Sequence, residues 1–462
     1  MAGIGFTLER LAHGRTLSSV AAAYVYAAAL VAGPWIFTVL GVAGISFAAC
    51  TTACDDLQVF RSIIIYNSVF SLIWSSPIAF VATRFVSDQI YVGKNQHVMF
   101  ALVVSLGVFA LGAFAIGIPF YTFATTLSGL EKILGLQNLV LIGSSWLLIP
   151  FVGAIRGART VALAFAAGAA IMVGAVALDG GSRPAVLLGA FNLGLSLIVF
   201  VLVLRLTAEF SIRIVPCAEL WRTAVRNWEL IAIGMSYGVG LWIDKFVMWI
   251  AAPLGTVRAA GGFQTMPNYD TPMFWAQLAA IPVIAVFFVH VETNFYRLCR
   301  DFYPRLDQKA SLRELQAAIA KLSRFVLFSL AGLFISLVAI CILAILMSLV
   351  AVDPLGLQAS QMGVLRSGLV GMACHTTAMF CFIFFLYFDL KRQALLISLT
   401  QLVLSGSLTA LLLPLGLRVY GYGFMLASAV TLMVGVGLLM KELPWLHYHA
   451  FVTNNSSLRD LP

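Results

Sequence analysis

The sequence is poor in charged residues. Only 10% of its 462 residues are Asp, Glu, Lys or Arg, whereas 61% are hydrophobic. Soluble domains have about 25% charged residues, so this composition excludes an ordinary soluble domain. Apolar runs of about 20 residues recur along the whole length, as helical membrane spans require. The sequence therefore predicts an all-α polytopic membrane protein.

Sequence motifs of enzymes are also missing. No Walker A sequence is present, so the chain itself is not expected to hydrolyse nucleotide. HExxH, CxxC and GxSxG do not occur in a usable context. The seven cysteines form no disulfide framework; only Cys50 and Cys54 fall near the predicted outer face, where two unpaired residues are favoured over a disulfide. We therefore predict a membrane transporter without metal or cofactor, and not an enzyme.

Twelve membrane spans are predicted from the apolar runs and from the charged, Gly or Pro residues between them. They lie at about 18–48, 60–86, 97–124, 134–154, 158–178, 183–207, 227–252, 268–292, 322–350, 360–388, 393–416 and 420–441. With these spans, 21 of the 28 Lys and Arg residues fall in inner segments and 6 in outer segments. This bias predicts that both termini are cytosolic.

The spans are predicted to form two six-helix lobes. The first lobe covers residues 18–207 and the second residues 227–441, with a cytosolic connection at 208–226. Residues 1–17 and 442–462 are predicted to be cytosolic ends. Within the second lobe, Ser311-Leu312-Arg313-Glu314 has the pattern of a capping box and predicts an amphipathic helix on the inner surface at about 311–324.

A sparse internal repeat at an offset of 205 residues supports two related halves. Pro77 followed by Val86-Ser87-Asp88 corresponds to Pro282 followed by Val291-Glu292-Thr293, and Gly33 corresponds to Gly238. Transporters are often built from such repeats. The prolines and glycines are predicted hinge or kink positions, namely Gly33, Pro34, Pro77 and Pro282.

Two adjacent charges, Asp244 and Lys245, stand within the apolar segment 234–249. A charge at the centre of a membrane helix costs roughly 2.5–3.5 kcal/mol, and such residues usually face a cavity or each other. Two interpretations remain open. Lys245 either extends to the outer headgroups, or the pair lines a passage for the substrate.

Neighbouring polar and aromatic residues extend the candidate passage. The residues predicted to line it are Asp244, Lys245, Tyr237, Trp242, Tyr269, Asp270 and Gln277, and Glu292 and Tyr296 are predicted at its inner mouth. Aromatic rings stack on sugars, although in membrane proteins they are also common as interfacial anchors. Asn67 is a further polar residue in the second span.

Several segments resemble the PelG family of exopolysaccharide transporters. They are Met1-Ala2-Gly3-Ile4-Gly5-Phe6, Gly33-Pro34-Trp35, Trp242-Ile243-Asp244-Lys245 and Tyr269-Asp270. The resemblance implies a fold similar to that of multidrug, oligosaccharide-lipid and polysaccharide flippases. It also implies export of the N-acetylgalactosamine-rich Pel polymer across the bacterial inner membrane during biofilm matrix synthesis. The glycosyltransferase PelF and the membrane proteins PelD and PelE are the partners that the resemblance implies.

Three functions are therefore weighed. The first is polysaccharide transport through a passage between the lobes. The second is cation-coupled drug antiport or flipping of a lipid-linked oligosaccharide, for which Asp244 is the strongest carboxylate candidate. The third is a polytopic glycosyltransferase with Asp55 and Asp56 as its acids, against which the lack of a sizeable outer domain argues.

Overall fold

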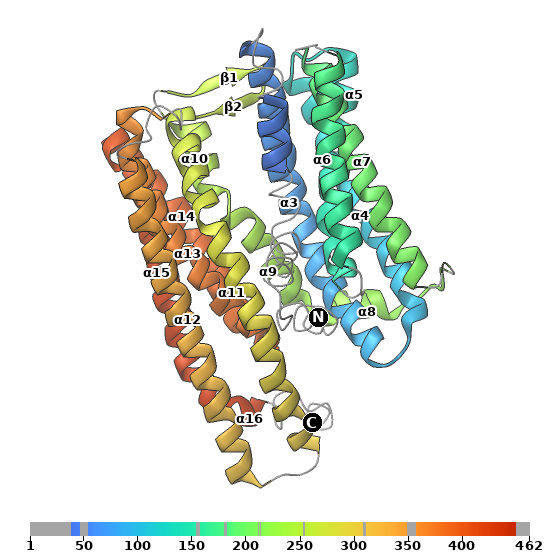
Figure 1. Cartoon of the computed structure of the whole chain (residues 1–462), viewed down its shortest axis with the longest axis vertical. Helices are drawn as coiled ribbons and strands as arrows, with labels where there is room; N and C mark the ends of the chain where they lie inside the picture. Colours follow the sequence, from blue (N-terminus) through green and yellow to red (C-terminus); the bar gives the residue numbers. More distant parts are fainter. Residues whose placement is uncertain are drawn as a thin grey trace. The chain divides into compact units, whose positions relative to one another are not determined.

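The computed structural model describes residues 38–46, 54–153, 158–179, 183–210, 212, 214–252, 255–307, 311–348 and 357–449. Contacts between Cα atoms divide these residues into two compact units, residues 38–267 and residues 268–449. Nearly all described residues are helical (Figure 1).

The first unit consists of helices and one small hairpin. Its long helices are α3 (Cys54–Tyr91), α4 (Val98–Pro119), α5 (Gly129–Val152), α6 (Ala158–Asp179) and α7 (Pro184–Glu209). The shorter elements are η1 (Asn95–His97), η2 (Phe120–Ala124), α8 (Glu219–Arg226), α9 (Trp228–Gly240), α10 (Ile243–Ala251), β1 (Val257–Ala259) and β2 (Phe263–Thr265). Residues 38–46 are also helical. Helix α3 packs against α4, α5 and α9, so it forms the core of this unit.

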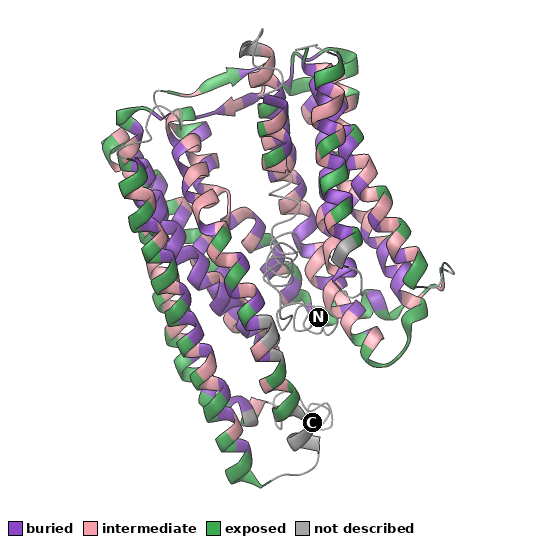
Figure 2. Ribbon diagram, viewed as in Figure 1, coloured by how far each residue is buried: buried purple, intermediate pink, exposed green. Residues whose placement is uncertain are grey.

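The second unit is built around α13 (Met362–Tyr387), which packs against three neighbouring helices. These neighbours are α12 (Leu312–Ser348), α14 (Lys391–Leu412) and α15 (Tyr422–Glu442), and α11 (Pro267–Asp307) enters the unit from the first. Short helical turns complete it: η3 (Ala359–Gln361), η4 (Leu413–Leu415), η5 (Leu417–Val419), η6 (Leu443–Trp445) and α16 (Leu446–Tyr448). Figure 2 shows α13 as mostly buried, because neighbours cover it on several sides.

The described residues contain ten helices long and apolar enough to cross a membrane, or eleven if α9 and α10 count as one broken span. They coincide with the second to twelfth predicted spans. The first predicted span, 18–48, lies mostly outside the described residues. The prediction of an all-α polytopic membrane protein is confirmed; the count of twelve and the cytosolic termini stay predictions.

The contact grouping differs from the predicted lobe boundary. Helices α9 and α10 were expected to open the second lobe, but they group with the first unit. The physical reason is the close approach of α9 to α3. A Cβ at Gly234 would lie 2.5 Å from the Cα of Pro77, and one at Gly238 would lie 3.0 Å from the Cα of Ile73. Glycine on one helix lets two backbones approach in this way.

The predicted capping box at the start of α12 is present. The Ser311 hydroxyl accepts from the Glu314 N–H at 3.4 Å, and the Ser311 N–H donates to the Glu314 carboxylate at 3.0 Å. The helix then continues without a break to Ser348, so the amphipathic turns and the membrane span form one helix. Leu315 is buried as the pattern predicts, whereas Leu312 is exposed because it lies at the helix end.

A two-stranded antiparallel hairpin joins α10 to α11, and the sequence did not reveal it. Its turn has positive φ at Ala260 (40°) and Gly261 (83°). The second value favours glycine, which has no Cβ. The Ala260 carbonyl accepts from the Thr126 N–H at 3.1 Å, which fixes the turn to the segment after η2.

Candidate functional site in the first unit

The candidate site begins at a break in a membrane span. Helix α9 ends at Gly240, α10 begins at Ile243, and their axes differ by 47°. The Trp242 N–H donates to the Val239 carbonyl at 2.9 Å, which closes the last turn of α9. In transporters, such discontinuous helices place free backbone groups and helix ends at binding sites.

Asp244 and Lys245 lie in the first turn of α10, directly after the break. Their side chains are 0% and 5% exposed, and the Lys245 Nζ lies 3.3 Å from Asp244 Oδ2. The Asp244 carboxylate is further favoured by the positive end of the α10 dipole. The Lys245 Nζ also lies 5.1 Å from the centre of the Trp242 ring, within the range of a cation–π contact. Burial of Lys245 argues against an ammonium group that extends to the headgroups.

The sequence Gly-Met-Ser-Tyr-Gly at 234–238 has the spacing of a hydrolase nucleophile motif, but its structure is that of a packing motif. Gly234 and Gly238 face the α3 backbone. The Ser236 hydroxyl donates to the Ala232 carbonyl at 2.8 Å, one turn back on the same helix. Tyr237 is half-buried, with its ring edge-on to Phe80 of α3 at 6.2 Å. This stretch therefore fixes α9 to α3.

Aromatic rings from four segments of the first unit form one cluster, here called the aromatic cluster: Tyr66, Phe70, Phe120, Tyr121, Phe246, Trp249 and Phe263. Tyr66 stacks on Trp249 of α10 at 5.1 Å and on Phe120 at 5.9 Å. The Tyr66 hydroxyl donates to the Gln264 carbonyl at 2.7 Å and accepts from the Gln264 N–H at 2.8 Å. The aromatic cluster thus holds α10 and the hairpin against α3.

A network of side-chain amides lies next to the aromatic cluster. Asn67 Nδ2 donates to Asn138 Oδ1 at 2.9 Å, and Asn138 Nδ2 donates to Asn192 Oδ1 at 2.8 Å. The Tyr121 hydroxyl donates to Asn67 Oδ1 at 2.8 Å. All four residues are buried. Buried polar groups that satisfy one another specify a unique packing, so this network joins α3, η2, α5 and α7 in one arrangement.

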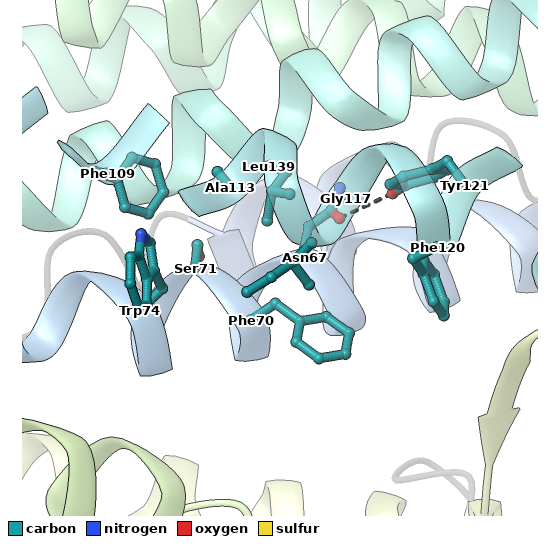
Figure 3. Close-up of a pocket in the computed structure, with 11 residues that line it drawn as sticks. Asn67, Phe70, Ser71, Trp74, Phe109, Ala113, Gly117, Phe120, Tyr121 and Leu139 are labelled. Carbon is teal, nitrogen blue, oxygen red and sulfur yellow. Dashed lines mark hydrogen bonds between the residues drawn. The ribbon is translucent and has the colours of Figure 1, made fainter. Parts of the chain in front are cut away.

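A small cavity adjoins the amide network (Figure 3). It holds about 20 Å³ and is lined by Asn67, Tyr121, Trp74 and apolar side chains of α3, α4 and α5. Trp74 Nε1 is buried and has no hydrogen-bond partner among the described residues. A cavity of this size accommodates about one water molecule. It is far too small for a sugar ring, so it is not a substrate site.

The predicted site residues divide between the two units. In the first unit, the structure brings Asp244, Lys245 and Trp242 together. Tyr269, Asp270 and Gln277 belong to α11 of the second unit, where Tyr269 is buried and the other two are half-buried. The same helix carries Glu292 and Tyr296, whose side chains lie outside the described set.

Of the predicted kink positions, two are described. Pro77 lies inside α3 and Pro282 inside α11, so both interrupt the hydrogen bonding of long helices. Gly33 and Pro34 lie outside the described residues. The role of these four residues as hinges stays a prediction.

Sequence reasoning missed the partners around the break. Tyr66, Tyr121 and Phe263 were not singled out, although they pack around α10. Asn138 and Asn192 were missed as well. One signal for them was present, because Asn67, Asn138 and Asn192 are single amides in three otherwise apolar predicted spans.

Long apolar helices, a broken span and a buried ion pair define a polytopic membrane transporter. Two solved transporters share this fold. One is an outward-facing multidrug resistance MATE family transporter of the MOP superfamily, with a TM-score of 0.65, 13% identity, and coverage of 96% of this chain and 97% of its own. The other is a MOP superfamily transporter from Pyrococcus furiosus, with a TM-score of 0.63, 12% identity, and coverage of 96% and 97%.

The family is more specific than the fold. Residues 1–451 match the family described as "PelG: Putative exopolysaccharide Exporter (EPS-E)". The chain belongs to this PelG family of exopolysaccharide exporters. No curated protein matches the chain.

Proposed function

We propose that this chain exports a Pel-like, N-acetylgalactosamine-rich exopolysaccharide across the bacterial inner membrane during synthesis of the biofilm matrix. Membership of the exporter family supports transport of an exopolysaccharide. The observation that carries the choice of a neutral polymer is the Asp244–Lys245 pair, because its two charges cancel at the break between α9 and α10.

A neutral polymer needs hydrogen bonds and ring stacking rather than a net charge. At the break, Asp244 and Lys245 supply polar atoms, and Trp242 and Tyr237 supply half-exposed rings. We propose that these residues line the passage with Tyr269, Asp270 and Gln277, and that Glu292 and Tyr296 stand at its inner mouth. The rigid aromatic cluster behind α10 would keep the break in place as the polymer passes.

The proposed partners follow from the substrate. A polymer exporter needs a cytosolic glycosyltransferase that delivers the chain, a role we assign to PelF. The membrane proteins PelD and PelE are proposed to join the complex. Purification of the solubilised chain from its own host, followed by identification of the bound proteins, tests this assignment. Recovery of the chain without any glycosyltransferase would contradict it.

The fold also supports cation-coupled antiport or flipping of a lipid-linked oligosaccharide, as the MATE and MOP structures share it. Cation coupling needs a carboxylate that gains and loses a cation. Asp244 is buried within 3.3 Å of Lys245, so a cation would have to displace the ammonium group. The ion pair therefore favours the polysaccharide.

The deciding experiment measures two quantities in a clean deletion strain. The deletion is expected to abolish secreted polymer while its sugar-nucleotide precursor continues to be made. The wild-type chain should restore secretion and leave the susceptibility of an efflux-deficient host to cationic drugs unchanged. Normal secretion in the deletion strain would overturn the proposal. Drug resistance conferred by the chain would support the antiporter instead.

A further inference from the structure

A second feature of the molecule lies in the second unit, between α11 and α12. These helices run antiparallel on either side of a groove of about 1220 Å³ (Figure 1). Figure 2 shows exposed residues along the whole of α12. Ligand pockets for small molecules measure about 300–1,000 Å³, so this groove has room for something larger and elongated.

One end of the groove is basic. Arg297 of α11 and Lys321 and Arg324 of α12 line it, and all three side chains are exposed. None of the described residues that line the groove is acidic. Lys321 and Arg324 make no ion pair within the described part of the chain. The positive-inside distribution predicts that this end faces the cytoplasm.

The remainder of the groove is apolar. Phe325 and Phe328 of α12 and Val286 of α11 form its walls, and Phe328 and Val286 are 72% and 49% exposed. From Arg297 to Pro282, and from Lys321 to Ser336, each helix rises about 22 Å. That length equals one leaflet of a bilayer that measures about 40–45 Å with its headgroups. The groove thus has one basic end and an apolar length that matches a single lipid layer.

We propose that this groove is a binding site for an anionic phospholipid of the cytoplasmic leaflet. Arg297, Lys321 and Arg324 hold its phosphate, and its acyl chains lie along Phe325 and Phe328. Basic pockets between membrane helices on the cytoplasmic side are typical sites for anionic headgroups. Arg donors fit the oxygens of a phosphate in a fixed geometry, whereas Lys adds a point charge.

The test uses the full-length chain purified in detergent, with lipid retention counted by native mass spectrometry. Phosphatidylglycerol is the probe. Phosphatidylcholine, which has no net charge, and undecaprenyl phosphate, a polyprenyl phosphate, are the comparison lipids. The triple variant Arg297→Gln/Lys321→Gln/Arg324→Gln removes the basic end. At about 1 kcal/mol per basic residue near a headgroup, retention of phosphatidylglycerol should fall about a hundredfold.

A matched variant controls for loss of charge alone. Arg313→Gln/Arg392→Gln/Lys441→Gln removes three exposed basic residues on the same predicted side but outside the groove. It should retain phosphatidylglycerol as the wild type does. Equal loss in both triple variants would overturn the proposal, because general attraction to the membrane would then explain retention.

A steric variant tests the apolar length without changing charge. A Cβ at Gly332, in the groove wall, meets no atom within 4 Å, so Gly332→Leu should fold and fill the groove. Gly437→Leu, at an equally open site on α15, is its control. Phosphatidylglycerol should be displaced only by Gly332→Leu. Retention in both variants, or preferential binding of undecaprenyl phosphate or phosphatidylcholine, would overturn the proposal.

Discussion

The buried pair of Asp244 and Lys245 gives the sharpest prediction for this protein. Each charge is almost completely removed from solvent, and the Nζ–Oδ2 distance is 3.3 Å. At an effective dielectric constant of about 20, two unit charges at this distance attract each other by about 5 kcal/mol. Much of that attraction offsets the cost of removing both charges from water.

Single substitutions should therefore be costly and the double substitution mild. Asp244→Asn leaves the Lys245 ammonium buried without its partner, and Lys245→Met does the same to the carboxylate. Each should lower the free energy of unfolding by about 3–5 kcal/mol. The variant with both changes removes both charges and should lose far less. The resulting coupling energy is expected to be about 3 kcal/mol.

The assay is a double-mutant cycle from reversible unfolding of the purified chain in mixed micelles. The exposed pair of Arg84 and Asp88, in α3, is the control, since its side chains are 38% and 51% exposed at a distance of 3.0 Å. Exposed pairs one helical turn apart couple by only about 0.3–0.5 kcal/mol. A coupling between Asp244 and Lys245 no larger than in this control would refute the reasoning.

Secretion measured on the same variants separates stability from transport. If the pair lines the passage, the stable double variant should still secrete less polymer than the wild type. Wild-type secretion from a double variant that is present at normal levels would limit the pair to a structural role.

Three further predictions concern the packing of the helices. Gly234→Ala should lower the free energy of unfolding by about 1–3 kcal/mol because its methyl group would meet the α3 backbone, whereas Gly107→Ala, in open space on α4, should be neutral or slightly stabilising; equal effects would contradict the close approach of α9 to α3. Asn67→Ala leaves several buried polar groups without a partner, at about 1–3 kcal/mol for each, and should cost more than Tyr121→Phe, which removes one donor; the reverse order would be inconsistent with the network. Ser311→Ala removes the cap of α12 and should cost about 1 kcal/mol, seen as faster hydrogen exchange in its first turn; unchanged exchange would show that the cap is not stabilising.

Most of the helices could be predicted from the sequence because a membrane span has a simple requirement, an apolar run of sufficient length. The same reasoning explains why Asp244 and Lys245 were recognisable, since a charge in such a run is rare. The start of α12 was also predictable, because a capping box depends only on residues within one turn.

The partners of these residues were not predictable. Asn67 meets Asn138 across 71 positions of sequence, and Tyr66 meets Gln264 across 198. Periodicity gives the face of a helix but not the helix that packs against it. The grouping of α9 with α3, and the hairpin between α10 and α11, depend on such pairings.

The sequence by itself determined the class of this protein, the approximate extent of the described helices and the presence of an unusual pair of charges. These follow from the cost of placing charges and backbone polar groups in lipid, which acts on every residue locally. Only the tertiary structure decided that Lys245 is buried against Asp244 and Trp242, and that basic and apolar residues of α11 and α12 share one groove. The distance between two side chains is set by helix packing, and packing depends on residues far apart in the chain.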